Sequence, residues 1–95
     1  MRIQTSPGDL LAEEFMKPLG LSGSELARHL KVPANRITDI LRNRRDVSAD
    51  TALRLARYFG TSARFWLNAQ TAYNLTKAEA EDAGRIAAEV KPRAA

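Results

Sequence analysis

Residues 22–45 constrain the fold more than any other part of this 95-residue chain. They read SGSELARHLKVPANRITDILRNRR, with apolar positions at helical spacing on both sides of a short connection over residues 31–33. Ser22 and Glu25 have the spacing of a capping box, in which each side chain accepts a hydrogen bond from a free backbone N–H at a helix start. The pattern therefore predicts two short helices within about residues 22–43.

Two helices joined by so short a connection must cross steeply and approach closely. A small residue on the first helix, Ala27, and an aliphatic residue ten positions later, Ile37, meet this requirement. Glycine is common at position 31 of such a turn, so Lys31 should cost about 1 kcal/mol if the left-handed conformation is kept. These spacings are typical of a helix-turn-helix, whose second helix lies in the major groove of DNA.

The polar residues around the second helix fall into two groups. Four residues near its N-terminal end are candidates for contacts with base edges: Asn35, Arg36, Thr38 and Asp39. Asp39 has two interpretations, because it could accept from cytosine or form an ion pair with Arg36 or Arg42. Residues at the helix ends and in the next loop are candidates for contacts with phosphate, namely Ser22, Ser24, Arg28, Arg42, Arg44 and Arg45.

Charge is distributed unevenly along the chain. The formal net charge is +4, and residues 28–45 hold six basic residues against the single acid Asp39. Acidic residues gather instead over residues 9–14 and 79–89. A basic patch of this kind attracts a phosphate backbone, although an arginine-rich face is also common on ordinary solvated surfaces.

Several function classes are not expected. The chain has no cysteine and one histidine, too few for a metal cluster, and it has no glycine-rich phosphate loop. No nucleophile–base spacing stands out, so we expect no enzyme, no metal and no cofactor. Apolar runs are far shorter than the roughly 20 residues that span a bilayer, and the N-terminus lacks a signal-peptide core. We expect a cytoplasmic protein, associated with the nucleoid when bound to DNA. A protein-interaction module without a DNA role remains an alternative.

Helical spacing also covers the remainder of the chain, and no stretch alternates over the length of a strand. Further helices are expected over about residues 7–20, 48–60 and 62–75. Thr76 and Glu79 again have capping-box spacing, which predicts a separate C-terminal helix over about residues 76–90. The whole chain, residues 1–95, is thus predicted to be one all-α domain.

The predicted helix over residues 62–75 carries three aromatic side chains. Such residues usually fill the core, but three exceed what a core of this size needs, so part of this surface could be a dimer interface. The candidates for this interface are Phe65, Trp66, Ala69 and Tyr73.

Two stretches carry a family resemblance: PGDLLAEEFMKPLGLS at residues 7–22 and ADTALRLARYFGTSARFWLNAQTAYNL at residues 49–75. With Phe65–Trp66–Leu67–Asn68 as its most specific signature, the chain resembles the HigA family of antitoxins, within the larger group of phage-repressor-like XRE/Cro regulators. The resemblance implies a lambda-repressor-like core of five helices followed by a C-terminal helix. It further implies a homodimer that binds double-stranded operator DNA and represses its own operon. One departure is Gly23, where phage repressors often carry glutamine.

The resemblance also implies a partner, a HigB-like toxin that cleaves messenger RNA. Because a ribonuclease of this kind would be basic, its inhibitor should offer acidic side chains. The candidates are Asp9, Glu13 and Glu14, or alternatively the acids within residues 79–89. The alternative function is a solitary helix-turn-helix regulator without a toxin partner.

Overall fold

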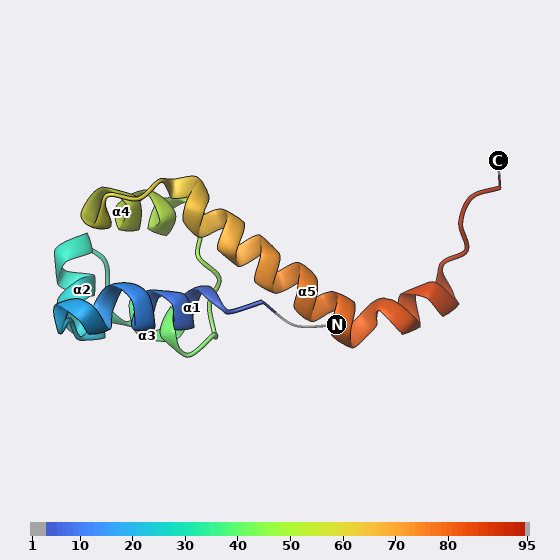
Figure 1. Cartoon of the computed structure of the whole chain (residues 1–95), viewed down its shortest axis with the longest axis horizontal. Coiled ribbons are helices and arrows are strands. Elements are labelled where there is room, and N and C mark those ends of the chain that lie inside the picture. Colours follow the sequence, from blue (N-terminus) through green and yellow to red (C-terminus); the bar gives the residue numbers. More distant parts are fainter. Residues whose placement is uncertain (1–3, 95) are drawn as a thin grey trace.

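The computed structural model describes residues 4–94, and every regular element in that range is helical (Figure 1). The expected all-α class is therefore confirmed; residues 1–3 and 95 of the predicted domain lie outside the described range. The elements are α1 (Pro7–Leu10), a π-helical segment η1 (Leu11–Met16), a 3-10 turn η2 (Lys17–Leu19), α2 (Gly23–Leu30), α3 (Ala34–Leu41), α4 (Ala49–Phe59) and α5 (Ala63–Glu89).

Serine side chains define the starts of four helices. The hydroxyl at each N-cap accepts a hydrogen bond from a backbone N–H three residues later, in Ser6, Ser22, Ser48 and Ser62. Ser22 forms a full capping box with Glu25, as the sequence predicts, with both hydrogen bonds at 3.1 Å. These caps satisfy N–H groups that have no partner within their own helix, so the local sequence determines where the four helices begin.

The turn between α2 and α3 has the expected geometry. Lys31 has φ 60° and ψ 43°, the left-handed conformation that glycine usually adopts. Its backbone N–H donates to the carbonyls of Ala27 and Arg28. The turn therefore keeps its shape despite a side chain that disfavours it.

The core lies where α1 and η1, α2, α3, α4 and the first turns of α5 meet. Trp66 is fully buried there; its ring centroid is 4.9 Å from that of Phe15, and its Nε1–H donates to the Thr61 hydroxyl at 2.8 Å. Trp66 has no surface to offer to a partner, so its assignment to a dimer interface is wrong. The side chain instead fills the space between α5 and the N-terminal helix.

The predicted boundary between a fifth and a sixth helix does not exist, because α5 runs unbroken from Ala63 to Glu89. Thr76 does not cap a new helix. Its hydroxyl lies 2.8 Å from the carbonyl oxygen of Ala72, one turn earlier, and accepts from the backbone N–H of Gln4 at 2.9 Å. No glycine or proline occurs over residues 63–83, so nothing in the backbone interrupts the helix.

The C-terminal half of α5 extends away from the rest of the domain (Figure 1). The described chain measures 52 × 21 × 21 Å and has a radius of gyration of 16.1 Å, compared with about 12 Å for a compact chain of this length. Leu75, Ile86 and Val90 are exposed along this extension. None of the described helices is both long and apolar enough to cross a membrane.

A buried glutamine on α5 anchors the loop that follows α3. The backbone N–H of Val47 donates to Gln70 Oε1 at 2.8 Å, and both residues are buried. The Gln70 amide donates to Asn74 Oδ1 at 2.9 Å, and the Asn74 amide donates to Asp46 Oδ2 at 3.1 Å. Two consecutive residues of the loop are thereby attached to α5.

Gly8 lets α1 approach α3 without steric overlap. A Cβ at this position would overlap the carbonyl oxygen of Ile40, whereas a Cβ at Gly84 in α5 would meet nothing within 4 Å. We expect Gly8→Ala to lower the free energy of unfolding by about 1–3 kcal/mol. The matched change Gly84→Ala should raise it by about 0.5–1 kcal/mol, because alanine restricts the unfolded chain. Urea denaturation measures both; effects of the same sign would contradict the close packing at Gly8.

Gln70→Met keeps a similar volume but removes the acceptor for the buried Val47 N–H. We expect a loss of about 1–3 kcal/mol in the free energy of unfolding, because that N–H would remain unsatisfied. Hydrogen exchange at the Val47 amide should become faster. The control is Asn74→Ala, an exposed member of the same chain of bonds, which should change stability by about 0.5 kcal/mol or less. A Gln70→Met variant as stable as the control would show that this anchor contributes nothing.

Candidate nucleic-acid interface

Close packing between α2 and α3 determines which side of α3 is free. Ala27 is 1% exposed and Ile37 is fully buried, as expected for the small and aliphatic members of a helix-turn-helix. At the start of α2, a Cβ on Gly23 would lie 3.3 Å from the Leu41 side chain and 3.4 Å from that of Thr38. Because glycine has no side chain, it allows α3 to lie close to α2 at this position.

One face of α3 is left for contacts with another molecule. Asn35, Thr38, Asp39 and Arg42 follow each other at intervals of three, one and three residues, so they share one side of the helix. Asn35 and Arg42 are exposed, while Thr38 and Asp39 are half-buried. The structure thus places three of the four base-edge candidates together, next to the phosphate candidate Arg42.

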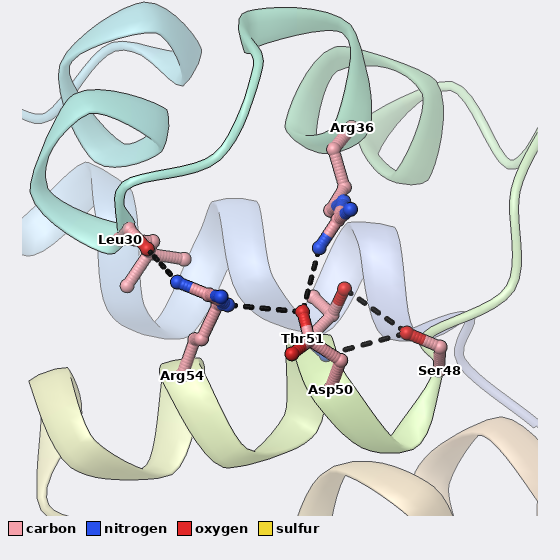
Figure 2. A network of polar contacts seen from close by, with 6 residues as sticks. All are labelled: Leu30, Arg36, Ser48, Asp50, Thr51 and Arg54. Carbon is pink, nitrogen blue, oxygen red and sulfur yellow. Dashed lines mark hydrogen bonds and ion pairs between the residues drawn. The ribbon is translucent and has the colours of Figure 1, made fainter.

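Arg36, the fourth base-edge candidate, points elsewhere. Its guanidinium donates to Asp50 Oδ2 on α4 at 2.7 Å, and its side chain is 29% exposed (Figure 2). The same carboxylate oxygen accepts from Arg54 Nε at 2.9 Å. Arg54 also donates through a second nitrogen to the backbone carbonyl of Leu30 at 2.9 Å. Arg36 therefore belongs to a polar network that joins α2, α3 and α4.

Asp50 and Arg54 were not among the site residues that the sequence predicted. The spacing of four residues between them is the signal that was available, because an acid and a base so placed form a pair on one helix. Their connection to Arg36 and Leu30 spans long stretches of sequence and follows no local pattern.

The carboxyl group of Asp50 is ionised near neutral pH. The hydrogen bond from Arg54, and after it the bond from Arg36, lowers the pKa of Asp50 below its ordinary value of 3.8. A depressed pKa means that the carboxylate stabilises the fold above its ordinary pKa, and that this contribution is lost only as the pH falls through the lowered value. The network is therefore intact throughout the neutral range.

Asp39 pairs with neither of the expected arginines. Its carboxylate lies 3.8 Å from Arg45 in the loop after α3. Asn43 has φ 59°, which turns the chain back, and the Arg44 backbone N–H donates to the carbonyl of Asp39 at 2.8 Å. The turn brings Arg45 alongside Asp39, so the expectation of a pair with Arg36 or Arg42 is wrong.

The phosphate candidates are all exposed: Ser22, Ser24, Arg28, Arg42, Arg44 and Arg45. Ser22 also has a structural task, because its hydroxyl and backbone N–H form the capping box. Arg44 and Arg45 lie in the loop that Gln70 anchors through Val47. The basic loop is therefore held in place by α5, beside the free face of α3.

The other candidate residues lie on α1, η1 and α5. The acids Asp9, Glu13 and Glu14 are exposed on α1 and η1, and Glu13 forms an ion pair with Lys17 at 3.1 Å. Of the remaining dimer candidates, Phe65 is 40% exposed, and Ala69 and Tyr73 are half-buried.

Comparison with known proteins agrees with this geometry. The family model described as helix-turn-helix matches residues 13–66. Virulence-associated protein I of Dichelobacter nodosus is 56% identical over 73 residues, which cover 77% of this chain and 68% of that protein.

Two solved structures are similar over nearly the whole chain. The Pseudomonas aeruginosa antitoxin HigA with the higBA promoter is 44% identical, with a TM-score of 0.88 and coverage of 95% of this chain and 98% of that one. The antitoxin GraA in complex with its operator is also 44% identical, with a TM-score of 0.89 and coverage of 100% and 95%. The chain therefore belongs to the XRE-type helix-turn-helix family and, within it, to the HigA antitoxins that its sequence resembles.

Proposed function

We propose that this chain is a sequence-specific DNA-binding antitoxin that represses its own operon and neutralises a HigB-like toxin. The observation that carries the DNA-binding part is the free face of α3, where Asn35, Thr38, Asp39 and Arg42 lie side by side. The two solved relatives, each described with promoter or operator DNA, support it. Both are named as antitoxins rather than enzymes, in line with the expectation of no catalytic role.

The residues on this surface would have two different roles in DNA recognition. Asn35 and Thr38 would contact base edges in the major groove. Asparagine can form two hydrogen bonds with adenine, whereas threonine can bond with more than one kind of base. Arg42 and Arg44 would contact phosphates and set the register without choosing a sequence. Arg45 reduces the electrostatic penalty of Asp39 near phosphate, because their side chains lie 3.8 Å apart.

A symmetric homodimer would present two such surfaces to a palindromic operator. Exposed apolar side chains favour this assembly: Phe65 near the start of α5, and Leu75, Ile86 and Val90 along its extension. A helix that leaves its own domain with apolar residues exposed gains stability when a partner covers them. Ala69 and Tyr73 remain candidates at the edge of the same interface.

The neutralising surface is proposed to include Asp9, Glu13 and Glu14. These acids lie on helical turns held to the core by buried Leu11 and Met16, so their positions are preset. Two of the acids in the alternative group, Asp82 and Glu89, are both paired with Arg85 at 3.2 and 3.3 Å. Glu13 is paired as well, with Lys17, so the preference for the N-terminal acids depends on their preset positions beside the core.

Binding to the promoter DNA upstream of the gene tests the assigned roles. Asn35→Ala should cost about 1–3 kcal/mol on the operator and relax the preference at one position per half-site. Arg44→Ala should weaken operator and random DNA alike and make binding less dependent on salt. Footprinting of the wild-type chain should show two protected half-sites about 34 Å apart on one face of the duplex. Equal losses on specific and random DNA for both variants would contradict the division of roles, and a single protected half-site would contradict the dimer.

Co-expression with the small open reading frame beside the gene tests the antitoxin role. That product alone should stop growth, and this chain should restore it. The double change Asp9→Lys and Glu14→Lys should weaken the rescue while operator binding is kept, because like charges would repel the toxin. Glu81→Lys, in the alternative group of acids over residues 79–89, should leave the rescue intact; a loss of rescue there would instead favour that group. A harmless neighbour, or a failed rescue, would leave a solitary regulator as the better description.

A further inference from the structure

Two residues of α4, Asp50 and Arg54, connect both helices of the helix-turn-helix to α4. Asp50 Oδ2 accepts from Arg36 at the start of α3 and from Arg54 on α4 (Figure 2). Arg54 in turn donates to the carbonyl of Leu30, the last residue of α2. That carbonyl lies at a helix end and has no partner within its helix, so the arginine satisfies it.

We propose that Asp50 is a positioning residue for DNA recognition and that Arg36 acts through it rather than by reading a base. This inference rests on the proposed function, because it concerns how α3 is presented to the operator. Its direct consequence is that an acidic residue strengthens binding to the operator, even though the operator is a polyanion.

The start of α3 lacks the side-chain cap that is present at the starts of α2, α4 and α5. Serine hydroxyls cap α2, α4 and α5, whereas Pro33 at the N-cap of α3 provides no side-chain hydrogen bond. Arg36 is the third residue of α3. Its side chain connects this first turn to α4 through the hydrogen bond to Asp50. The same turn would enter the major groove, so its orientation matters most for reading bases.

Helix geometry separates Arg36 from the residues that face outward. It lies one turn before Ile40, which is 1% exposed, and on the flank of α3 that faces α4. To reach a base, its guanidinium would have to leave a 2.7 Å bond with Asp50. Asn35 and Thr38 need no such rearrangement.

The network should matter more for binding than for stability. Asp50 is 56% exposed and Arg54 is 40% exposed, and ion pairs at such positions contribute little to folding. Removal of an acid close to a DNA-binding face would, by charge alone, strengthen binding to every DNA sequence. A positioning role predicts the opposite sign on the operator, which separates the two effects.

The experiment uses the full chain and four variants: Asp50→Ala, Arg36→Met, the double variant, and Arg57→Met as the control. Arg57 is an exposed arginine on α4 that forms no ion pair within residues 4–94. Affinity is measured for the operator, for single base-pair variants of the operator and for a random duplex, at several salt concentrations. Thermal unfolding of every variant shows whether the fold is retained.

Asp50→Ala and Arg36→Met should each bind the operator about tenfold more weakly, the size of one charge-assisted hydrogen bond. Asp50→Ala should bind the random duplex no more weakly than the wild type. The double variant should bind the operator about as weakly as Asp50→Ala or Arg36→Met, because each of these changes already removes the hydrogen bond between Arg36 and Asp50. In Asp50→Ala and Arg36→Met, the weakened preference between base pairs should be spread over the whole half-site. The control Arg57→Met should keep the wild-type preference at every base pair.

Two results would overturn the positioning role. One is Arg36→Met losing its preference at a single base pair while Asp50→Ala keeps all of its preferences, which would make Arg36 a base reader. The other is Asp50→Ala binding the operator as tightly as the wild type or more tightly. A wild-type chain without any preference for its operator would instead overturn the proposed function, and the positioning role with it.

Discussion

The close approach of α2 and α3 is the constraint on which the remainder of the site depends. Ala27 and Ile37 are almost completely buried where these helices meet, and the backbone between them turns through a left-handed Lys31. A larger residue at position 27 would push α3 outward and change its tilt. Because this contact occupies one side of α3, the opposite side is free for the proposed contact with DNA.

The arginines of this chain perform two different tasks that their residue type does not reveal. Arg36 and Arg54 hold helices together through Asp50, while Arg42 and Arg44 remain available to a polyanion. An arginine close to a carboxylate is partly neutralised before any ligand arrives, so it adds less to long-range attraction. The basic surface is therefore smaller, and better ordered, than the count of arginines suggests.

Local sequence was sufficient for several features that depend on residues close together in the chain. The Ser22–Glu25 capping box, the left-handed turn at Lys31 and the pairing of Ala27 with Ile37 are examples. The same reasoning failed at Thr76, where capping-box spacing occurs inside a continuous helix. Capping competes there with a hydrogen bond to Ala72, and continuation of the helix also keeps its backbone bonds.

The sequence by itself determined the all-α class and the helix-turn-helix, because these depend on periodicity and short spacings. Its motifs over residues 7–22 and 49–75 also carried the resemblance to the HigA group. Only the tertiary structure decided that Trp66 fills the core, that Asp39 pairs with Arg45 and that Arg36 turns toward Asp50. Each of these outcomes depends on which side of a helix its neighbours occupy. Residues distant in sequence, such as Val47 and Gln70, meet only after the helices have packed.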